Sequence, residues 1–336
     1  MNSGAHSDSH LIPFDPAARE LGVIVGYDGS ENATRALHYA ARAAGRRGAV
    51  LNVITVYRVP TAIYTTYAAL PQVPEDEAKK AEAQTLLNAA AEFLKDYPGE
   101  VYYRAVEGDS VGALAELTSQ AQLAVVGARG RGGFLGRILG SVASALPSHT
   151  QCPTVVVPHD YGKGESLESP DFTPVRSDAP VVVGVDQSNL SRVAALYAAA
   201  AAQERDTTLV MLMALPPLDT NMAWYPELAS DVDRVTTQRT EELRAHLDEE
   251  VAWLKGHFPS VEIRGTVEVG EPSVLLKQMT SQAQLTVLGS RGRGAFVSAL
   301  LGSTSRGVLY KAEGPVLVVP ALDDPRLPER EAADAE

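Results

Sequence analysis

The chain has 336 residues, 45% hydrophobic and 21% charged, a balance typical of a folded chain and too apolar for a disordered one. Its 29 basic and 42 acidic side chains give a formal charge of −13, which argues against general binding to nucleic acid or anionic lipid. The single cysteine, Cys152, excludes an internal disulfide, and the most apolar stretch, 193–202, is too short to span a membrane. Because no basic and apolar leader is present, we expect a cytoplasmic protein.

The first half of the sequence alternates short apolar runs with longer amphipathic stretches, which predicts strands and helices in turn. In chain order, we expect strands at 22–27, 50–56, 101–106, 123–127 and 154–158, and helices at 31–46, 75–96, 109–119 and 141–148. The strand runs are continuously apolar, which is typical of strands buried on both faces of a parallel sheet. The pattern therefore predicts an α/β fold, a doubly wound five-stranded parallel sheet between two layers of helices.

The second half of the sequence repeats the first. The segment VIVGYDGS at 23–30 recurs as VVVGVDQS at 181–188, and TSQAQL at 118–123 recurs letter for letter at 280–285. The offset changes only from 158 to 162 residues, so the chain is a tandem duplication of one fold. We predict the following organisation: a first domain at 18–158, an acidic linker at 159–179, a second domain at 180–320 and an acidic tail at 321–336.

Glycine-rich loops follow the fourth predicted strand of each repeat, at the edge where doubly wound sheets bind ligands. Each loop reads Gly-x-Arg-Gly, nine further residues, and then Gly-Ser at the start of a predicted helix. Backbone amides from such glycines and from a helix N-terminus bind phosphate groups. The residues are Gly127, Arg129, Gly130, Gly140 and Ser141 in the first repeat, and Gly289, Arg291, Gly292, Gly302 and Ser303 in the second.

A single Gly-x-x-Gly could equally be a plain tight turn. Two features favour an anionic ligand: both repeats keep the full spacing, and the loops at 127–141 and 289–303 contain arginines but no acidic residue. The P-loop pattern is absent from the sequence, and the glycine loops follow the fourth strand instead of the first. These observations argue against a P-loop NTPase and against a dinucleotide-binding Rossmann domain.

The first strand ending in V-G-x-D-x-S, together with the spacing of the glycine loop, resembles the ATP-binding branch of the universal stress protein family. The resemblance covers about residues 20–158 and 180–320 as two tandem domains. It implies an adenine nucleotide alpha hydrolase-like fold with ATP, or another adenine nucleotide, in each repeat. The ribose and phosphates would then lie along the glycines and serines of the two loops.

The resemblance also assigns residues outside the glycine loops. Asp28 and Asp186 match the family's aspartate that faces the adenosine, and Val53 and Met211 match the strand-two position that contacts adenine through its backbone. From the residues alone, each aspartate could instead cap the following helix or hold Mg²⁺ beside the phosphates, and the sequence does not decide between these roles. The aromatic segments at 64–67 and 224–225 could cover the site as lids or serve packing.

We therefore expect a nucleotide-binding regulatory protein of the stress response, with one adenine nucleotide in each domain. A weak ATPase is an alternative, but the sequence offers no base to position a water, so we do not expect an efficient enzyme. A dimerising scaffold with vestigial nucleotide sites is the other alternative. The family pairs its domains through the last strand, which implies that 154–158 and 316–320 meet as an intramolecular pseudo-dimer; further homodimerisation stays open.

Overall fold

The structure is a computed structural model that describes residues 11–59, 75–130, 139–174, 177–217, 229–292 and 301–327. The two aromatic segments proposed as lids lie outside these residues, as do Arg131, Arg137 and Arg293 of the glycine loops. None of the described helices is long and apolar enough to cross a membrane.

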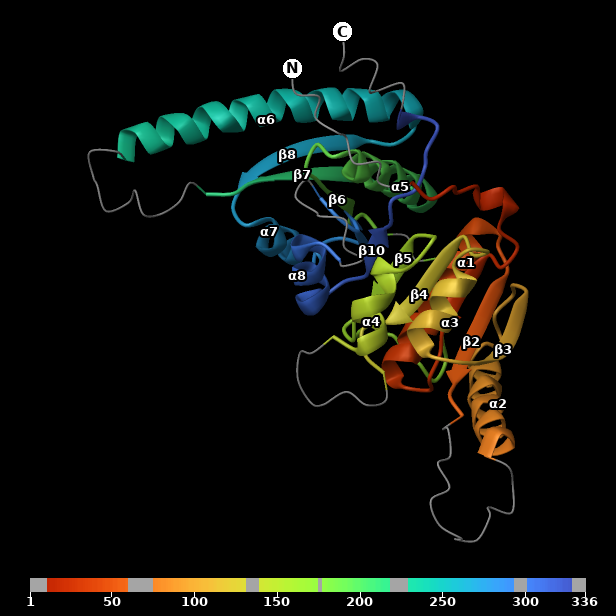
Figure 1. Cartoon of the computed structure of the whole chain (residues 1–336). Coiled ribbons are helices and arrows are strands. Elements are labelled where there is room, and N and C mark those ends of the chain that lie inside the picture. The colour runs from red at the N-terminus through yellow and green to blue at the C-terminus, as the bar shows by residue number, and fades with distance from the viewer. Residues whose placement is uncertain are drawn as a thin grey trace, which may run out of the picture.

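The first half folds in the predicted order of strands and helices (Figure 1). Its elements are η1 (Pro16–Ala18), β1 (Val23–Gly26), α1 (Glu31–Arg47), β2 (Leu51–Tyr57), α2 (Glu75–Phe93), β3 (Val101–Glu107), α3 (Ser110–Leu117), β4 (Leu123–Gly127), α4 (Ser141–Ala145), η2 (Leu146–Ser148) and β5 (Thr154–Val157). The helix predicted at 141–148 is divided in two, because Pro147 lacks the N–H that would continue an α-helix.

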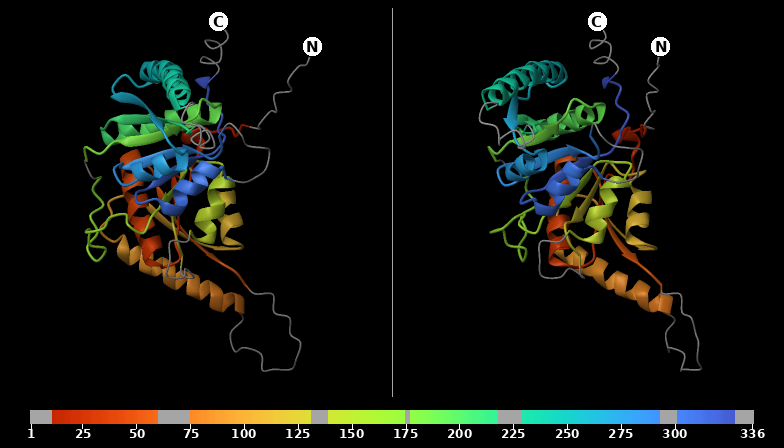
Figure 2. Two further views of the ribbon diagram at one scale, coloured as in Figure 1. Left: turned by 90° about the vertical axis from the view of Figure 1, so that its left-hand side faces the viewer. Right: turned by 60° about the vertical axis from the view of Figure 1, so that its left-hand side comes forward.

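The second half follows the same order. Its elements are β6 (Val181–Val185), α5 (Asn189–Arg205), β7 (Leu209–Leu215), α6 (Ala229–His257), β8 (Ile263–Val269), α7 (Pro272–Met279), β9 (Leu285–Gly289), α8 (Ser303–Lys311) and β10 (Val316–Val319). Figure 2 shows α2 and α6, the corresponding helices of the two halves, at opposite ends of the molecule.

All the named strands join one ten-stranded sheet in the order β3-β2-β1-β4-β5-β10-β9-β6-β7-β8. The strands are parallel in the order β3-β2-β1-β4-β5 in the first half and in the equivalent order β8-β7-β6-β9-β10 in the second, which confirms the predicted doubly wound fold. The halves meet through β5 and β10, which pair antiparallel with Val155 opposite Leu317. The predicted intramolecular pairing of the fifth strands is therefore confirmed, and it covers two strand edges that would otherwise be open.

Alternate residues of the strands form two cores, one on each face of the sheet. One core contains Val23, Val25 and Val53 and is covered by α1, α2, α5 and α6. The other contains Ile24, Ile54 and Leu114 and is covered by α3, α4, α7 and α8. Because both cores continue across the β5–β10 junction, the two halves share one hydrophobic interior.

Residues 159–174, which follow β5, pack against α1. His38 and Arg42 on this helix are buried, and both contact the backbone carbonyl of Asp171, at 2.8 Å and 3.0 Å. Arg42 also forms an ion pair of 2.9 Å with Glu165, and Phe172 is buried in the core. The composition of 159–179 predicted a linker, but these contacts show that its described first part is held on the surface of the first half.

This packing predicts a pH dependence of folding. Burial lowers the pKa of His38, with the charge of Arg42 adding to the effect, so the folded chain keeps this imidazole neutral. The unfolded chain takes up a proton near pH 6.5, so stability is present above that value and is lost as pH falls below it. Between pH 7.5 and 5, His38 makes the free energy of unfolding, measured with urea, fall with pH by at most about 1.4 kcal/mol per pH unit. We expect His38→Gln to remove this contribution. The unmodified protein, measured over the same pH range, provides the reference slope.

Candidate functional site

The first half contains a cavity of about 520 Å³ at the carboxyl ends of β1 and β4. The strand ends, the N-terminus of α4 and one side of α3 form its walls. Six residues predicted from the sequence line it together: Asp28, Gly127, Arg129, Gly130, Gly140 and Ser141. The residues after β1 and β4 converge because parallel strands end at one edge of the sheet, and strand order reverses between these two.

The second half contains a matching cavity of about 340 Å³ at the ends of β6 and β9. It brings together the six equivalent residues: Asp186, Gly289, Arg291, Gly292, Gly302 and Ser303. The two cavities are thus related by the repeat, although the described walls of the second enclose less space.

Two glycines let the backbone approach the aspartate after the first strand. A Cβ added at Gly130 would lie 2.6 Å from Oδ2 of Asp28, and a Cβ at Gly292 would collide with Oδ2 of Asp186 in the same way. Each aspartate therefore lies directly against the glycine loop. A larger residue here would have to displace the aspartate carboxylate, which the spacing of the motif alone did not show.

The N-termini of α4 and α8 face the cavities without a side-chain cap. Gly140 and Gly302 are the N-cap residues, and neither can supply the oxygen that usually accepts from the first amides. Their own N–H groups donate to the carbonyls of Ala128 and Ser290, at 2.8 Å and 2.9 Å, which ties each helix start to its glycine loop. The first amides of each helix are therefore positioned to bind an anion in the cavity.

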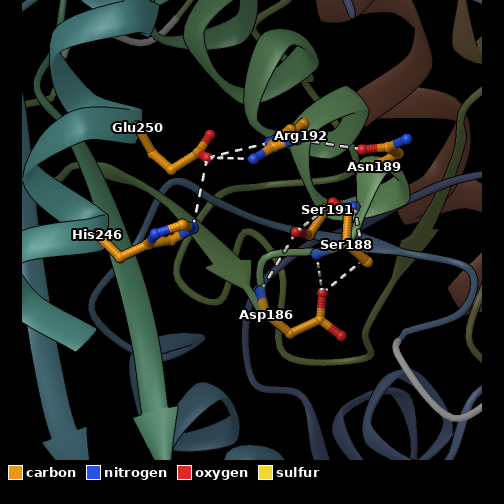
Figure 3. A network of polar contacts seen from close by, with 7 residues as sticks. All are labelled: Asp186, Ser188, Asn189, Ser191, Arg192, His246 and Glu250. Carbon is orange, nitrogen blue, oxygen red and sulfur yellow. Dashed lines mark hydrogen bonds and ion pairs between the residues drawn. The ribbon is translucent and has the colours of Figure 1, made fainter. Parts of the chain in front are cut away.

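The aspartates order the turn that begins the next helix, but they are not its N-cap. Oδ1 of Asp28 accepts from the N–H of Ser30 at 3.0 Å, and Ser30 is the cap of α1. Oδ1 of Asp186 accepts from both the N–H and the hydroxyl of Ser188, at 3.1 Å and 2.6 Å (Figure 3). Capping thus belongs to the serines, and each aspartate both holds the turn and lines the cavity.

In the turn after the first strand, the second repeat has Gln187 where the first has Gly29. Both Gly29 and Gln187 have left-handed backbone, with φ of 78° and 66°. Glycine adopts this conformation freely, whereas a residue with a Cβ is strained there by about 1 kcal/mol. The turn keeps the same shape in both repeats, and in the second repeat the backbone of Gln187 is strained.

This strain predicts opposite effects of two substitutions. We expect Gln187→Gly to raise the free energy of unfolding of the second half by about 1 kcal/mol, and Gly29→Ala to lower that of the first half by a similar amount. Both tryptophans, Trp224 and Trp253, belong to the second repeat, so their fluorescence follows urea unfolding of that half. Calorimetry measures the Gly29→Ala variant. If the free energy of unfolding changed in the same direction in both variants, the explanation by backbone strain would be wrong.

The structure does not bring Val53 and Met211 into the cavities. Their side chains are buried in the core on the opposite face of the sheet. Side chains alternate along a strand, so the neighbouring Ile54 and Leu212 line the cavities instead. The predicted adenine contact of Val53 and Met211 was through the backbone, and it stays a prediction.

Sequence reasoning missed several apolar residues of the cavity walls. In the first half these are Tyr27, Ile54, Val56 and Leu114, and in the second Val185, Leu212, Ala214 and Leu276. The strand residues follow from the alternation of side chains, but the contribution of α3 and α7 depends on the packing of these helices against the sheet. No group of three or more His, Cys, Asp or Glu side chains in the described residues could hold a metal ion.

A buried ion pair lies above the turn of Asp186 in Figure 3. Arg192 on α5 donates two hydrogen bonds to Oε1 of Glu250 on α6, at 3.0 Å and 2.8 Å, and a third to Asn189 at 3.2 Å. The side chains of Arg192 and Glu250 are 8% and 5% exposed. The first repeat has Thr34 and Ala90 at the equivalent positions, so this pair connects α5 to α6 only in the second half.

Comparison with known proteins agrees with this geometry. The model of the universal stress protein family matches residues 22–158 and 179–320. The chain is 33% identical over 301 residues to universal stress protein Rv2623 of Mycobacterium tuberculosis, covering 89% of this chain and 96% of that protein. Universal stress protein Rv1996 of the same organism is 31% identical over 333 residues, with 92% and 98% covered. A solved universal stress protein from Archaeoglobus fulgidus has the same fold, with a TM-score of 0.61 at 18% identity over 90% of this chain and 99% of that one.

Proposed function

The chain belongs to the universal stress protein family and carries two family domains in tandem; on this premise we propose that each domain binds one ATP and that the chain acts as a nucleotide-dependent regulatory protein of the stress response. The observation that carries the proposal is the repeated constellation of strand-end aspartate, glycine loop and uncapped helix N-terminus in both cavities. If these loops were only tight turns, the two repeats would have no reason to keep the same aspartate, glycines and helix start at the same edge of the sheet.

The chemistry of the first cavity fits an adenine nucleotide. The amides at the start of α4, the hydroxyl of Ser141 and the guanidinium of Arg129 would hold the phosphates, since all three donate hydrogen bonds to anions. Ile54 and Val56 offer an apolar wall for the base, and Asp28 offers acceptors to ribose hydroxyls. Gly302, Ser303, Arg291 and Asp186 would do the same in the second half.

The walls support binding better than hydrolysis. Asp28 is the only carboxylate in the described lining of the first cavity, which contains no histidine, and Oδ1 of Asp28 already accepts from Ser30. A hydrolase needs a group that positions the attacking water. Bound ATP would instead act by favouring one conformation of the chain over another.

Native mass spectrometry of the full chain with ATP tests the proposal. We expect two bound nucleotides per chain and a rise in the thermal unfolding midpoint with ATP concentration. Phosphate release should be no faster than from a chain in which both Gly140 and Gly302 are replaced by Glu. A chain that binds no nucleotide and that ATP does not stabilise would overturn the proposal, and faster release than from this variant would favour the ATPase.

A further inference from the structure

A third cavity, of about 430 Å³, lies between the two halves. The first half contributes the start of its glycine loop and residues 158–160, directly after β5. The second half contributes 309–313, the C-terminal end of α8 and the residues that follow it. The cavity therefore exists only because the β5–β10 pairing brings the two halves together.

The lining of this cavity contains as many acids as permanent cations, but its acids are paired with lysines outside it. Arg129, His159 and Lys311 line it, together with the two acids Asp160 and Glu313. Both acids are engaged from outside the lining: Asp160 pairs with Lys163 at 2.6 Å, and Glu313 pairs with Lys277 at 2.7 Å. Arg129 and Lys311 provide charged donors of the kind that a phosphate group needs, whereas Nδ1 of His159 contacts Oδ1 of Asn32 at 3.2 Å.

The rest of the lining favours an ester over a bare anion. The last residues of α8 line the cavity, and the last carbonyls of an α-helix have no partner within the helix and can accept hydrogen bonds from hydroxyl groups. Leu309 and Pro158 add apolar surface. The geometry points to a binding site for a small, hydroxyl-bearing phosphate ester between the two domains, separate from the two proposed nucleotide sites.

The internal repeat does not produce a second copy of this site. At the equivalent positions of the other half, His159 is replaced by Ala321 and Lys311 by His149. There the N-terminal segment pairs with the chain, since the N–H of Ile12 donates to the carbonyl of Ala321 at 2.7 Å. We therefore expect one ester-binding site per chain, whereas the repeat provides two nucleotide cavities.

Arg129 lines both this cavity and the nucleotide cavity of the first half. Two anions that share one guanidinium compete for it, so each ligand would weaken the binding of the other, and by the same factor. This coupling rests on the proposed nucleotide binding, whereas the ester site itself does not.

Calorimetric titration of the full chain with glycerol 3-phosphate at constant ionic strength tests the site. We expect one ester per chain, and we expect Lys311→Gln to weaken its binding about tenfold, the loss of one charge-assisted hydrogen bond. Arg306→Gln is the matched control, because it removes a positive charge from the exposed face of the same helix outside the lining. The titration contains no nucleotide, so ester binding in it separates this site from failure of the nucleotide proposal.

Three results would overturn the inference. These are no ester binding by the unmodified chain, equal weakening by Lys311→Gln and Arg306→Gln, and equal binding of sulfate and glycerol 3-phosphate, which would indicate an adventitious ion only. In the titrations with ATP, weaker ATP binding in the presence of the ester supports the coupling, and unchanged ATP binding removes the shared role of Arg129.

Discussion

Gly140→Glu is expected to reduce the bound ATP from two nucleotides per chain to one. The added Cβ would lie 3.2 Å from Cα of Arg129 and 3.4 Å from the carbonyl oxygen of Ala128, against the backbone of the glycine loop that lines the cavity. The new carboxylate would occupy the N-terminus of α4, where it satisfies the amides and repels the phosphates. We expect the affinity of the first site to fall at least about a hundredfold, which corresponds to about 2.7 kcal/mol.

The count of nucleotides by native mass spectrometry measures this effect site by site. Gly302→Glu should remove the other nucleotide, and the double variant should bind none. Gly256→Glu is the matched control, since a Cβ at Gly256 on α6 meets nothing within 4 Å and the residue lies outside both cavities. If Gly140→Glu and Gly256→Glu retain the same number of nucleotides, the assignment of the phosphate site is wrong.

Arg192→Leu is expected to cost the second half about 3–5 kcal/mol of folding free energy. The substitution leaves the carboxylate of Glu250 buried without its guanidinium, and His246, 3.9 Å away and a third exposed, replaces it poorly. Urea unfolding followed by tryptophan fluorescence reports the change, because Trp253 is on α6, the same helix as Glu250.

Two further variants distinguish the buried charge from a general loss of packing. The double variant Arg192→Leu and Glu250→Leu should recover most of the stability, because it removes both charges together. Arg264→Leu removes one partner of an exposed pair, with side chains 67% and 60% exposed, and should cost less than about 1 kcal/mol. A loss at Arg192 no greater than the loss at Arg264 would show that the buried pair contributes little.

Much of the candidate site could be predicted because its residues follow the strand ends directly. Asp28 and Gly127 are positioned by the ends of β1 and β4, and parallel strands bring their carboxyl ends to one edge whatever the helices do. Ile54 shows the limit of this reasoning: the strand was predicted, but Ile54 was not named as the residue whose side chain lines the cavity. The walls from α3 and α7 depend on helix packing, for which the sequence has no local signal.

The sequence by itself determined the duplication, the α/β fold and the two glycine loops, because apolar period, turn residues and internal repetition are local properties of the chain. The tertiary structure alone decided what distinguishes the halves. Arg192 and Glu250 are 58 residues apart, and Arg129 and Lys311 belong to different repeats, so only folding makes them neighbours. Contacts between such distant residues depend on how helices pack and how β5 meets β10, and for this reason the repeat encodes two similar sites in a molecule whose halves differ.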